Sequence, residues 1–321
     1  MPITVDEWLA GVPAPFPTSI SNSSRELFAK CPQRWAYKYF LGEGDSEPSI
    51  HLVAGGAFAK GIDTARKAFF SKRLAHEEAV HLGVEALKTE YLARQGDQDF
   101  SGEAKSLPGM VGALYSYFNE WHMERDYIQP LPDAPGEGAE LDFAIPLETI
   151  HPQTREPILY SGVIDLLGYN AKNDTIWVED DKTTGALGAS WVKQWRLDSQ
   201  LTGYCWAARQ YGIPVAGCMV RGTSILKRSY GHAEVLEPRT EHEVADWHAQ
   251  LIETIDEMKV VWTKFNHRKR ITRRLDKFFC NAYGSHCPFL NACGSPKPED
   301  WLRPAKPGTP GEMLDNIFEG L

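Results

Sequence analysis

The first third of the chain carries apolar residues at helical spacing. Ser21 begins a run of N-cap side chains, and the apolar residues after it fall on one face of a helix. The same spacing recurs over residues 75–94 and 110–125, which predicts two further helices. Residues 1–20 are rich in proline, and we expect them to form a loosely held arm. Prolines and glycines over residues 130–138 predict a linker.

From residue 140 the pattern changes to the period of two that is typical of strands. Leu141, Phe143 and Ile145 alternate with other residues, and Asn173 marks a turn between two later strand-like runs. Strands are predicted over residues 159–169, 175–182 and 215–225, and helices over residues 191–210 and 241–265. The order predicts an α/β protein with three parts: a helical region at 1–139, a sheet core at 140–240, and a C-terminal region at 241–321.

Composition narrows the class of protein. A chain of 321 residues with 42% hydrophobic residues can bury a sizeable core. Its net charge of -9 argues against binding nucleic acid through a general positive field, yet allows an enzyme with a carboxylate metal site. Six cysteines are too few for a disulfide scaffold. The apolar stretches are short or broken and no secretory signal is evident, so we expect a cytoplasmic protein with no membrane partner.

Acidic residues and a lysine recur in the predicted hairpin. Asp165 ends the pattern Gly-Val-Ile-Asp, and Asp180-Asp181-Lys182-Thr183 stands on the next strand. Asp180 and Lys182 project to the same side of a strand, and an antiparallel neighbour can bring Asp165 within reach. Two converging carboxylates suit Mg²⁺, and a lysine beside it can orient a water for attack on phosphorus. The alternative is a solvated strand end with ordinary alternating charges.

The predicted helix over residues 191–210 adds Gln200 and Tyr204, which share one helical face. Tyr204 is alternatively a core aromatic. Taken in order, G-x-x-D, D-x-K-T and Q-x-x-x-Y resemble the PD-(D/E)XK nuclease superfamily, especially its RecB-like branch. The resemblance implies a restriction-endonuclease-like core, a mixed sheet flanked by helices, with helical additions and a C-terminal cysteine-rich segment.

The same resemblance implies roles for individual residues. Asp165 and Asp180 would bind Mg²⁺ or Mn²⁺, Lys182 would be catalytic, and Glu140 would be an outer acidic contributor to the metal site. Gln200 and Tyr204 would position the DNA backbone or the attacking water. The sequence departs from the family at Lys60, which stands where RecB-like members often carry a histidine, in Gly-Ala-Phe-Ala-Lys. An ammonium group cannot ligate Mg²⁺, so Lys60 would contact a phosphate instead.

Four cysteines form a second candidate site. Cys280, Cys287 and Cys293 are separated by six and then five residues, and Cys31 lies far upstream. This arrangement resembles iron–sulfur nucleases of the AddB type and of the CRISPR-associated exonuclease family, which implies a structural 4Fe-4S cluster. Those families commonly have two residues between the first C-terminal pair. Four thiolates also suit Zn²⁺, and unligated thiols are a further alternative. Cys205 and Cys218 are expected in the core.

A basic run over residues 264–277 is either a solvated helix end or a surface that follows DNA phosphates. Candidates for stacking on single strands are aromatic residues near the other motifs: Trp191, Trp195, Tyr37 and Tyr39. The sequence therefore predicts a metal-dependent DNA exonuclease or end-processing nuclease. Its partners would be DNA ends or single strands, with a helicase or recombination partner supplying any motor, in repair, recombination or phage replication. The alternative is a non-catalytic DNA-end-binding subunit, with zinc as its stabilising ion.

Overall fold

The computed structural model describes residues 1–43, 49–132, 139–268, 271–281, 286–297, 299 and 302. Contacts divide the chain into two compact units. The first unit comprises Met1–Glu47, Ala144–Ser161 and Ala249–Leu321, and the second comprises Pro48–Phe143 and Gly162–His248. The three-part division at residues 139/140 and 240/241 stays a prediction.

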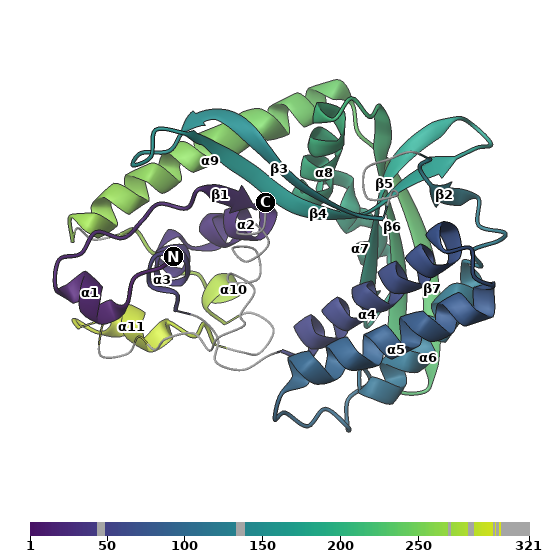
Figure 1. Cartoon of the computed structure of the whole chain (residues 1–321). Coiled ribbons are helices and arrows are strands. Elements are labelled where there is room, and N and C mark those ends of the chain that lie inside the picture. The colour runs from purple at the N-terminus through teal and green to yellow at the C-terminus, as the bar shows by residue number, and fades with distance from the viewer. Residues whose placement is uncertain are drawn as a thin grey trace. The chain divides into compact units, whose positions relative to one another are not determined.

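The second unit is a mixed sheet with helices on both faces (Figure 1). Its strands are β2 (Ile128–Pro130), β4 (Pro157–Asn170, from Gly162), β5 (Thr175–Thr184), β6 (Val215–Leu226) and β7 (Ser229–Pro238). β4 runs antiparallel to β5, β5 parallel to β6, and β6 antiparallel to β7. β3 (Ala139–Ile150) also pairs with β4. In all, seven strands of the described chain belong to the sheet, which confirms the predicted α/β fold class.

The helices of the second unit cover both faces of its sheet. Three helices with a shared apolar core lie together in Figure 1: α4 (Ile50–Arg66), α5 (His76–Gln95) and α6 (Leu107–Glu120). A π-helical turn, Lys67–Ser71, extends α4. On the other side of the sheet lie α7 (Ala189–Lys193), a 3₁₀ turn (Gln194–Leu197) and α8 (Ser199–Gln210).

The single helix predicted over residues 191–210 is interrupted. Asp198 has an extended backbone, with ψ 126, and its carboxylate accepts a hydrogen bond from Leu201 N. A new helix, α8, therefore begins after Asp198, because an N-cap aspartate satisfies amide groups at a helix start. The helix predicted over residues 110–125 likewise ends early, at Glu120.

The first unit contains α1 (Val5–Leu9), β1 (Ser19–Ser21), α2 (Asn22–Lys30) and α3 (Pro32–Leu41), together with α10 (Lys277–Cys280) and α11 (Leu290–Gly294). α9 (Glu241–Asn266) contributes to both units. Residues 1–20 are not a loose arm. Phe16 is 2% exposed, and Trp262 donates its indole N–H to the carbonyl of Ala14 at 2.7 Å. The prolines at 13, 15 and 17 keep the segment after α1 extended, and its carbonyls are free to accept hydrogen bonds from the core.

Candidate active site on strand β5

The hairpin of β4 and β5 brings two predicted carboxylates together. The register pairs Leu166 with Glu179, so Asp165 and Asp180 are the next residues along the two strands and face each other. The backbone N–H of Asp181 donates to Asp165 Oδ2 at 3.1 Å. The hairpin predicted from the sequence is therefore present, and it places Asp165 beside Asp180 as expected.

Lys182 lies on the same face of β5 as Asp180. Its Nζ is 2.6 Å from Asp180 Oδ2, and a third of the lysine side chain is exposed while that of Asp180 is buried. Burial lowers the pKa of Lys182, but Asp180 and Asp165 outweigh that effect, and the pKa is raised. The ammonium group therefore stays charged and holds Asp180 in the absence of another cation.

Asp165 shows the electrostatic signature of a site for a cation. Burial, and then repulsion from Asp180, raise the pKa of Asp165 to about 8. Two carboxylates held side by side are relieved by a positive ion between them, and oxygen ligands suit Mg²⁺ and Mn²⁺. In the part of the chain that the structure describes, no group of three or more His, Cys, Asp or Glu side chains is arranged to hold a metal ion. Among the described residues, waters or substrate oxygens would supply the remaining ligands of such an ion.

Helix α8 presents Gln200 and Tyr204 toward these acids. Gln200 Nε2 donates to the Tyr204 hydroxyl at 2.7 Å. Burial, then the charges of Asp180 and Asp165, raise the pKa of Tyr204, so its hydroxyl remains a donor. The Tyr204 ring packs edge-on against Phe143, with centroids 6.0 Å apart. Tyr204 is thus a core aromatic and also part of the acidic site.

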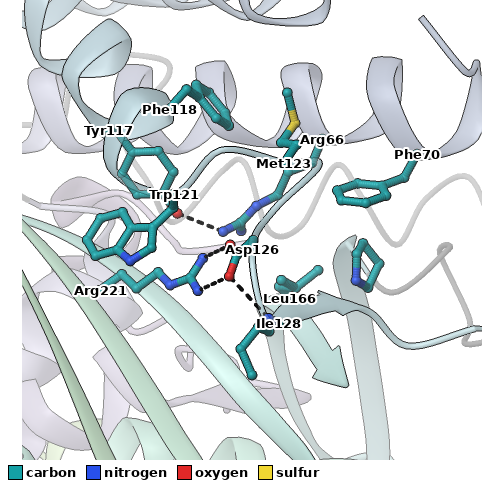
Figure 2. A pocket seen from close by; sticks show the side chains of 11 residues that line it. Arg66, Phe70, Tyr117, Phe118, Trp121, Met123, Asp126, Ile128, Leu166 and Arg221 are labelled. Carbon is teal, nitrogen blue, oxygen red and sulfur yellow. Dashed lines mark hydrogen bonds and ion pairs between the residues drawn. The ribbon is translucent and has the colours of Figure 1, made fainter. Parts of the chain in front are cut away.

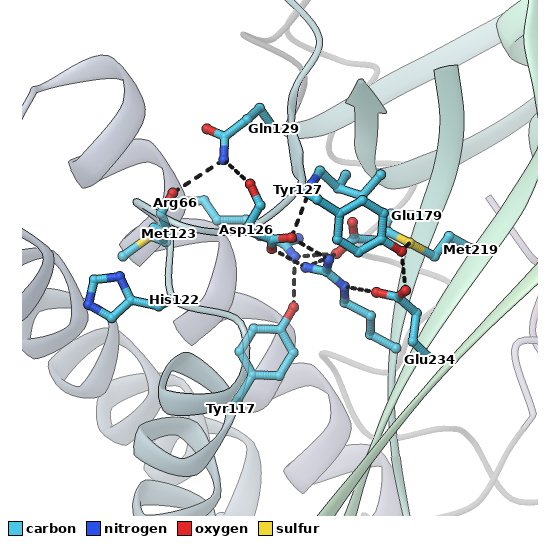
Figure 3. A network of polar contacts seen from close by, with 12 residues as sticks. Arg66, Tyr117, His122, Met123, Asp126, Tyr127, Gln129, Glu179, Met219 and Glu234 are labelled. Atoms are coloured by element: carbon cyan, nitrogen blue, oxygen red, sulfur yellow. Dashed lines mark hydrogen bonds and ion pairs between the residues drawn. The ribbon is translucent and has the colours of Figure 1, made fainter. Parts of the chain in front are cut away.

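The opposite face of β5 carries a buried network that the sequence motifs did not reveal. Glu179 and Asp181 point away from Lys182 and form ion pairs with Arg66 of α4. The network continues from Asp126 to Arg221 of β6, and from Arg221 to Glu234 of β7. Figure 3 shows Asp126 and Glu234 within this network. Figure 2 shows the adjoining pocket, which Arg66 and Arg221 line together with aromatic and aliphatic side chains.

Two other expected contributors to the site are Glu140 and Lys60. Glu140 lies in β3, and its side chain is outside the described residues, so its role as an outer metal contributor stays a prediction. Lys60 lies on α4 and pairs with Asp63, their charged atoms 3.7 Å apart. Lys60 is half exposed there, with 46% of its side chain accessible.

The four cysteines predicted as ligands belong to the first unit. Cys287 N donates to the Cys280 carbonyl at 2.8 Å. Burial, then the neighbouring Cys287 and Cys31, raise the pKa of Cys293 to about 11. Cys205 and Cys218 are fully buried in the second unit, as expected.

The expected DNA-stacking aromatics are mostly core residues. Trp191 and Trp195 are buried and pack edge-on, with centroids 5.4 Å apart, and Tyr37 is buried against Phe289. In the basic run, Arg268 stacks over the Trp8 ring at 4.7 Å. Lys269 and Arg270 lie outside the described residues.

Comparisons with known proteins identify the family of the chain. The model of the PD-(D/E)XK nuclease superfamily matches residues 19–294, and the chain belongs to that superfamily. Its members are generally nucleases that use Mg²⁺ or Mn²⁺. No curated protein matches the sequence. Among solved structures, the chain is similar to one titled "Crystal structure of SSO0001", with 13% identity over 63% of this chain and 74% of that chain, and a TM-score of 0.28. None of the described helices is long and apolar enough to span a bilayer.

Proposed function

We propose that this protein is a metal-dependent deoxyribonuclease of the RecB-like branch that hydrolyses phosphodiester bonds from DNA ends. The observation that carries the proposal is the convergence of Asp165, Asp180 and Lys182 on one face of the β4–β5 hairpin. Gln200 and Tyr204 border the same acids.

Each residue has a distinct role in this proposal. Asp165 and Asp180 hold the Mg²⁺ or Mn²⁺ ion, which supplies charge neutralisation at the phosphoryl oxygens when it is bound. Lys182 donates hydrogen bonds to the attacking water and orients it toward phosphorus. Gln200 and Tyr204 donate hydrogen bonds that position the DNA backbone. Because the Tyr204 hydroxyl keeps its proton, it serves as a donor and not as a base.

Cleavage of end-labelled single- and double-stranded DNA tests the proposal. We expect degradation that requires Mg²⁺ or Mn²⁺, and the order in which labels are released gives the polarity. Lys182→Ala should abolish cleavage, while Lys193→Ala, a matched change at an exposed lysine on α7, should not. If wild-type protein binds DNA ends without cleaving them, the protein is instead a DNA-end-binding subunit. If neither binding nor cleavage occurs, the proposal is wrong.

We further propose that Cys31, Cys280, Cys287 and Cys293 hold a structural 4Fe-4S cluster. The backbone hydrogen bond from Cys287 to Cys280 and the placement of all four cysteines in the first unit support a shared site. A cluster there would link chain segments separated by 248 residues between Cys31 and Cys280 and so favour the folded state. Anaerobic purification, followed by iron, sulfide and zinc analysis, distinguishes the cluster from zinc. Cys31→Ser should lower iron content, whereas the buried Cys218→Ser should not.

We also propose that the protein works with a helicase or recombination partner. Its role would lie in repair, recombination or phage replication. A motor partner is expected to stimulate cleavage of double-stranded DNA in the presence of ATP. The comparison to make is between the protein alone and the protein with a helicase from the same genome. Stimulation limited to double strands would support the partnership.

A further inference from the structure

Arg66 of α4 holds two carboxylates of β5 at once. Its Nη2 pairs with Glu179 and its Nη1 lies 3.0 Å from Asp181 Oδ2, and both acids are buried. Arginine suits this position because its planar fork can bind two carboxylates simultaneously, which a lysine ammonium cannot do in the same geometry. Burial lowers the pKa of Arg66, but the charges of Asp181 and Glu179 outweigh this effect, and the pKa is raised overall. The guanidinium is therefore charged.

Tyr117 of α6 completes the arrangement. Its hydroxyl donates to Asp181 Oδ1 at 2.7 Å and accepts a hydrogen bond from Arg66 Nη2 at 2.7 Å. Both oxygens of Asp181 are therefore bonded, one to each partner, and its side chain has a single orientation. Figure 3 shows Tyr117 pointing from its helix into the network beside Arg66.

Asp181 connects this buried network to the candidate active site. Its side chain points toward Arg66, while its backbone N–H donates to Asp165 Oδ2 on the other strand. Asp181 also lies between Asp180 and Lys182 in the chain. Arg66 and Tyr117 therefore act, through Asp181, on the acid that is expected to bind the cation.

We propose that Arg66 and Tyr117 are positioning residues that fix Asp181 and, through its backbone N–H, set the orientation of the Asp165 carboxylate for the cation. The inference rests on the proposed function, because it assigns Asp165 to the cation site. Residues that orient metal ligands typically change metal affinity or activity by about 10–100-fold when they are replaced.

The experiment compares Tyr117→Phe with Tyr127→Phe in the full-length protein. Both changes remove one hydroxyl from the same network, but Tyr127 is half-buried, contacts Glu234 on the β7 side, and does not contact Asp181. The readout is binding of Mn²⁺ alone, measured by electron paramagnetic resonance without DNA. We expect Tyr117→Phe to weaken Mn²⁺ binding about tenfold and Tyr127→Phe to leave it unchanged. Asp165→Asn should remove binding at this site.

A second variant, Arg66→Lys, separates position from charge. It keeps one positive charge but loses the fork, so we expect weakened Mn²⁺ binding and a higher Mn²⁺ requirement for cleavage, with an unchanged KM for DNA. The inference would be overturned if Tyr117→Phe and Tyr127→Phe bound Mn²⁺ equally well, whether at the normal or at a weakened level. It would also be overturned if the wild-type protein bound no Mn²⁺. Wild-type protein that binds Mn²⁺ but never cleaves DNA would overturn only the proposed function.

Discussion

Lys182 Nζ lies 2.6 Å from Asp180 Oδ2, and both side chains stand on the same face of β5. In this arrangement the lysine compensates one of two adjacent buried carboxylates, and Asp165 is left with a raised pKa. At neutral pH Asp165 therefore keeps a proton in the folded protein, and a bound divalent ion would take the place of that proton. Such a site is costly to fold alone and is stabilised by a bound divalent ion.

The raised pKa of Asp165 predicts that Asp165→Asn stabilises the protein without metal. Asp165 must take up a proton when the chain folds at neutral pH, whereas asparagine needs none, so the free energy of unfolding should rise by about 1 kcal/mol or more, which is about 1–2 °C in melting temperature. The measurement is thermal unfolding in EDTA at neutral pH. Added Mg²⁺ or Mn²⁺ should stabilise the wild type and not the variant.

Asp97→Asn is the matched control, because Asp97 is exposed after α5. It should change neither the melting temperature in EDTA nor the response to Mg²⁺. A variant Asp165→Asn that is less stable than wild type in EDTA, or that still responds to Mg²⁺ as wild type does, would contradict the electrostatic account of the site.

Much of this site could be predicted from the sequence because its parts are local. The β4–β5 hairpin places Asp165 and Asp180 together through a short turn, and Asp174 adopts the positive φ of 53 that a tight turn requires. Gln200 and Tyr204 share a face of α8 because of their spacing alone. Period and spacing were sufficient for these contacts.

The network on the other face of β5 could not be predicted in this way. Arg66 stands 113 residues before Glu179. In the sequence it looks like an ordinary basic residue in the last turn of a helix, and only the packing of α4 on the sheet brings it to the acids. β7 was also missed, because most of its residues are only half buried or exposed and show no clear alternation. Contacts that depend on tertiary packing leave no periodic signal.

Gly222 predicts a link between packing and the candidate active site. It is paired with Lys182 in the register, and a Cβ at residue 222 would lie 2.3 Å from the Trp191 ring. Gly222→Ala must displace this indole, so we expect a loss of about 1–3 kcal/mol of stability and, because Gly222 is the register partner of Lys182, reduced cleavage. Gly231→Ala on β7 approaches only a serine hydroxyl closely and should cost less. Similar losses in both variants would contradict this role of Trp191.

The stacked pair His76 and His122 predicts a pH dependence. Their ring centroids lie 3.6 Å apart, and burial followed by the charge of His122 lowers the pKa of His76. A histidine whose folded pKa is lowered is protonated first in the unfolded chain, so stability falls as pH drops below about 6.5. The other charges acting on His76 are those of Glu77, Glu124 and Arg125.

Replacing His122 by phenylalanine keeps the stacked ring and removes its charge. We expect His122→Phe to lose less stability than wild type between about pH 7 and about pH 5, measured by thermal unfolding. The control is His242→Gln, because the His242 side chain is 84% exposed. If His122→Phe and His242→Gln follow the same pH curve as wild type, the stacked pair does not contribute to acid sensitivity.

The close crossing of α4 and α5 predicts opposite effects for the same substitution at two helical glycines. A Cβ at Gly83 would lie 2.5 Å from the Gly61 carbonyl oxygen and 2.9 Å from the Ala65 Cβ. Alanine gains about 1 kcal/mol in helix propensity, but separating two backbones in a packed core costs about 1–3 kcal/mol. Because a backbone oxygen cannot turn aside, the cost prevails, and Gly83→Ala should lower the melting temperature. Gly55→Ala, in α4 with open space around it, should raise it. Equal shifts in the two variants would show that helix propensity alone decides, and that the helices can separate freely.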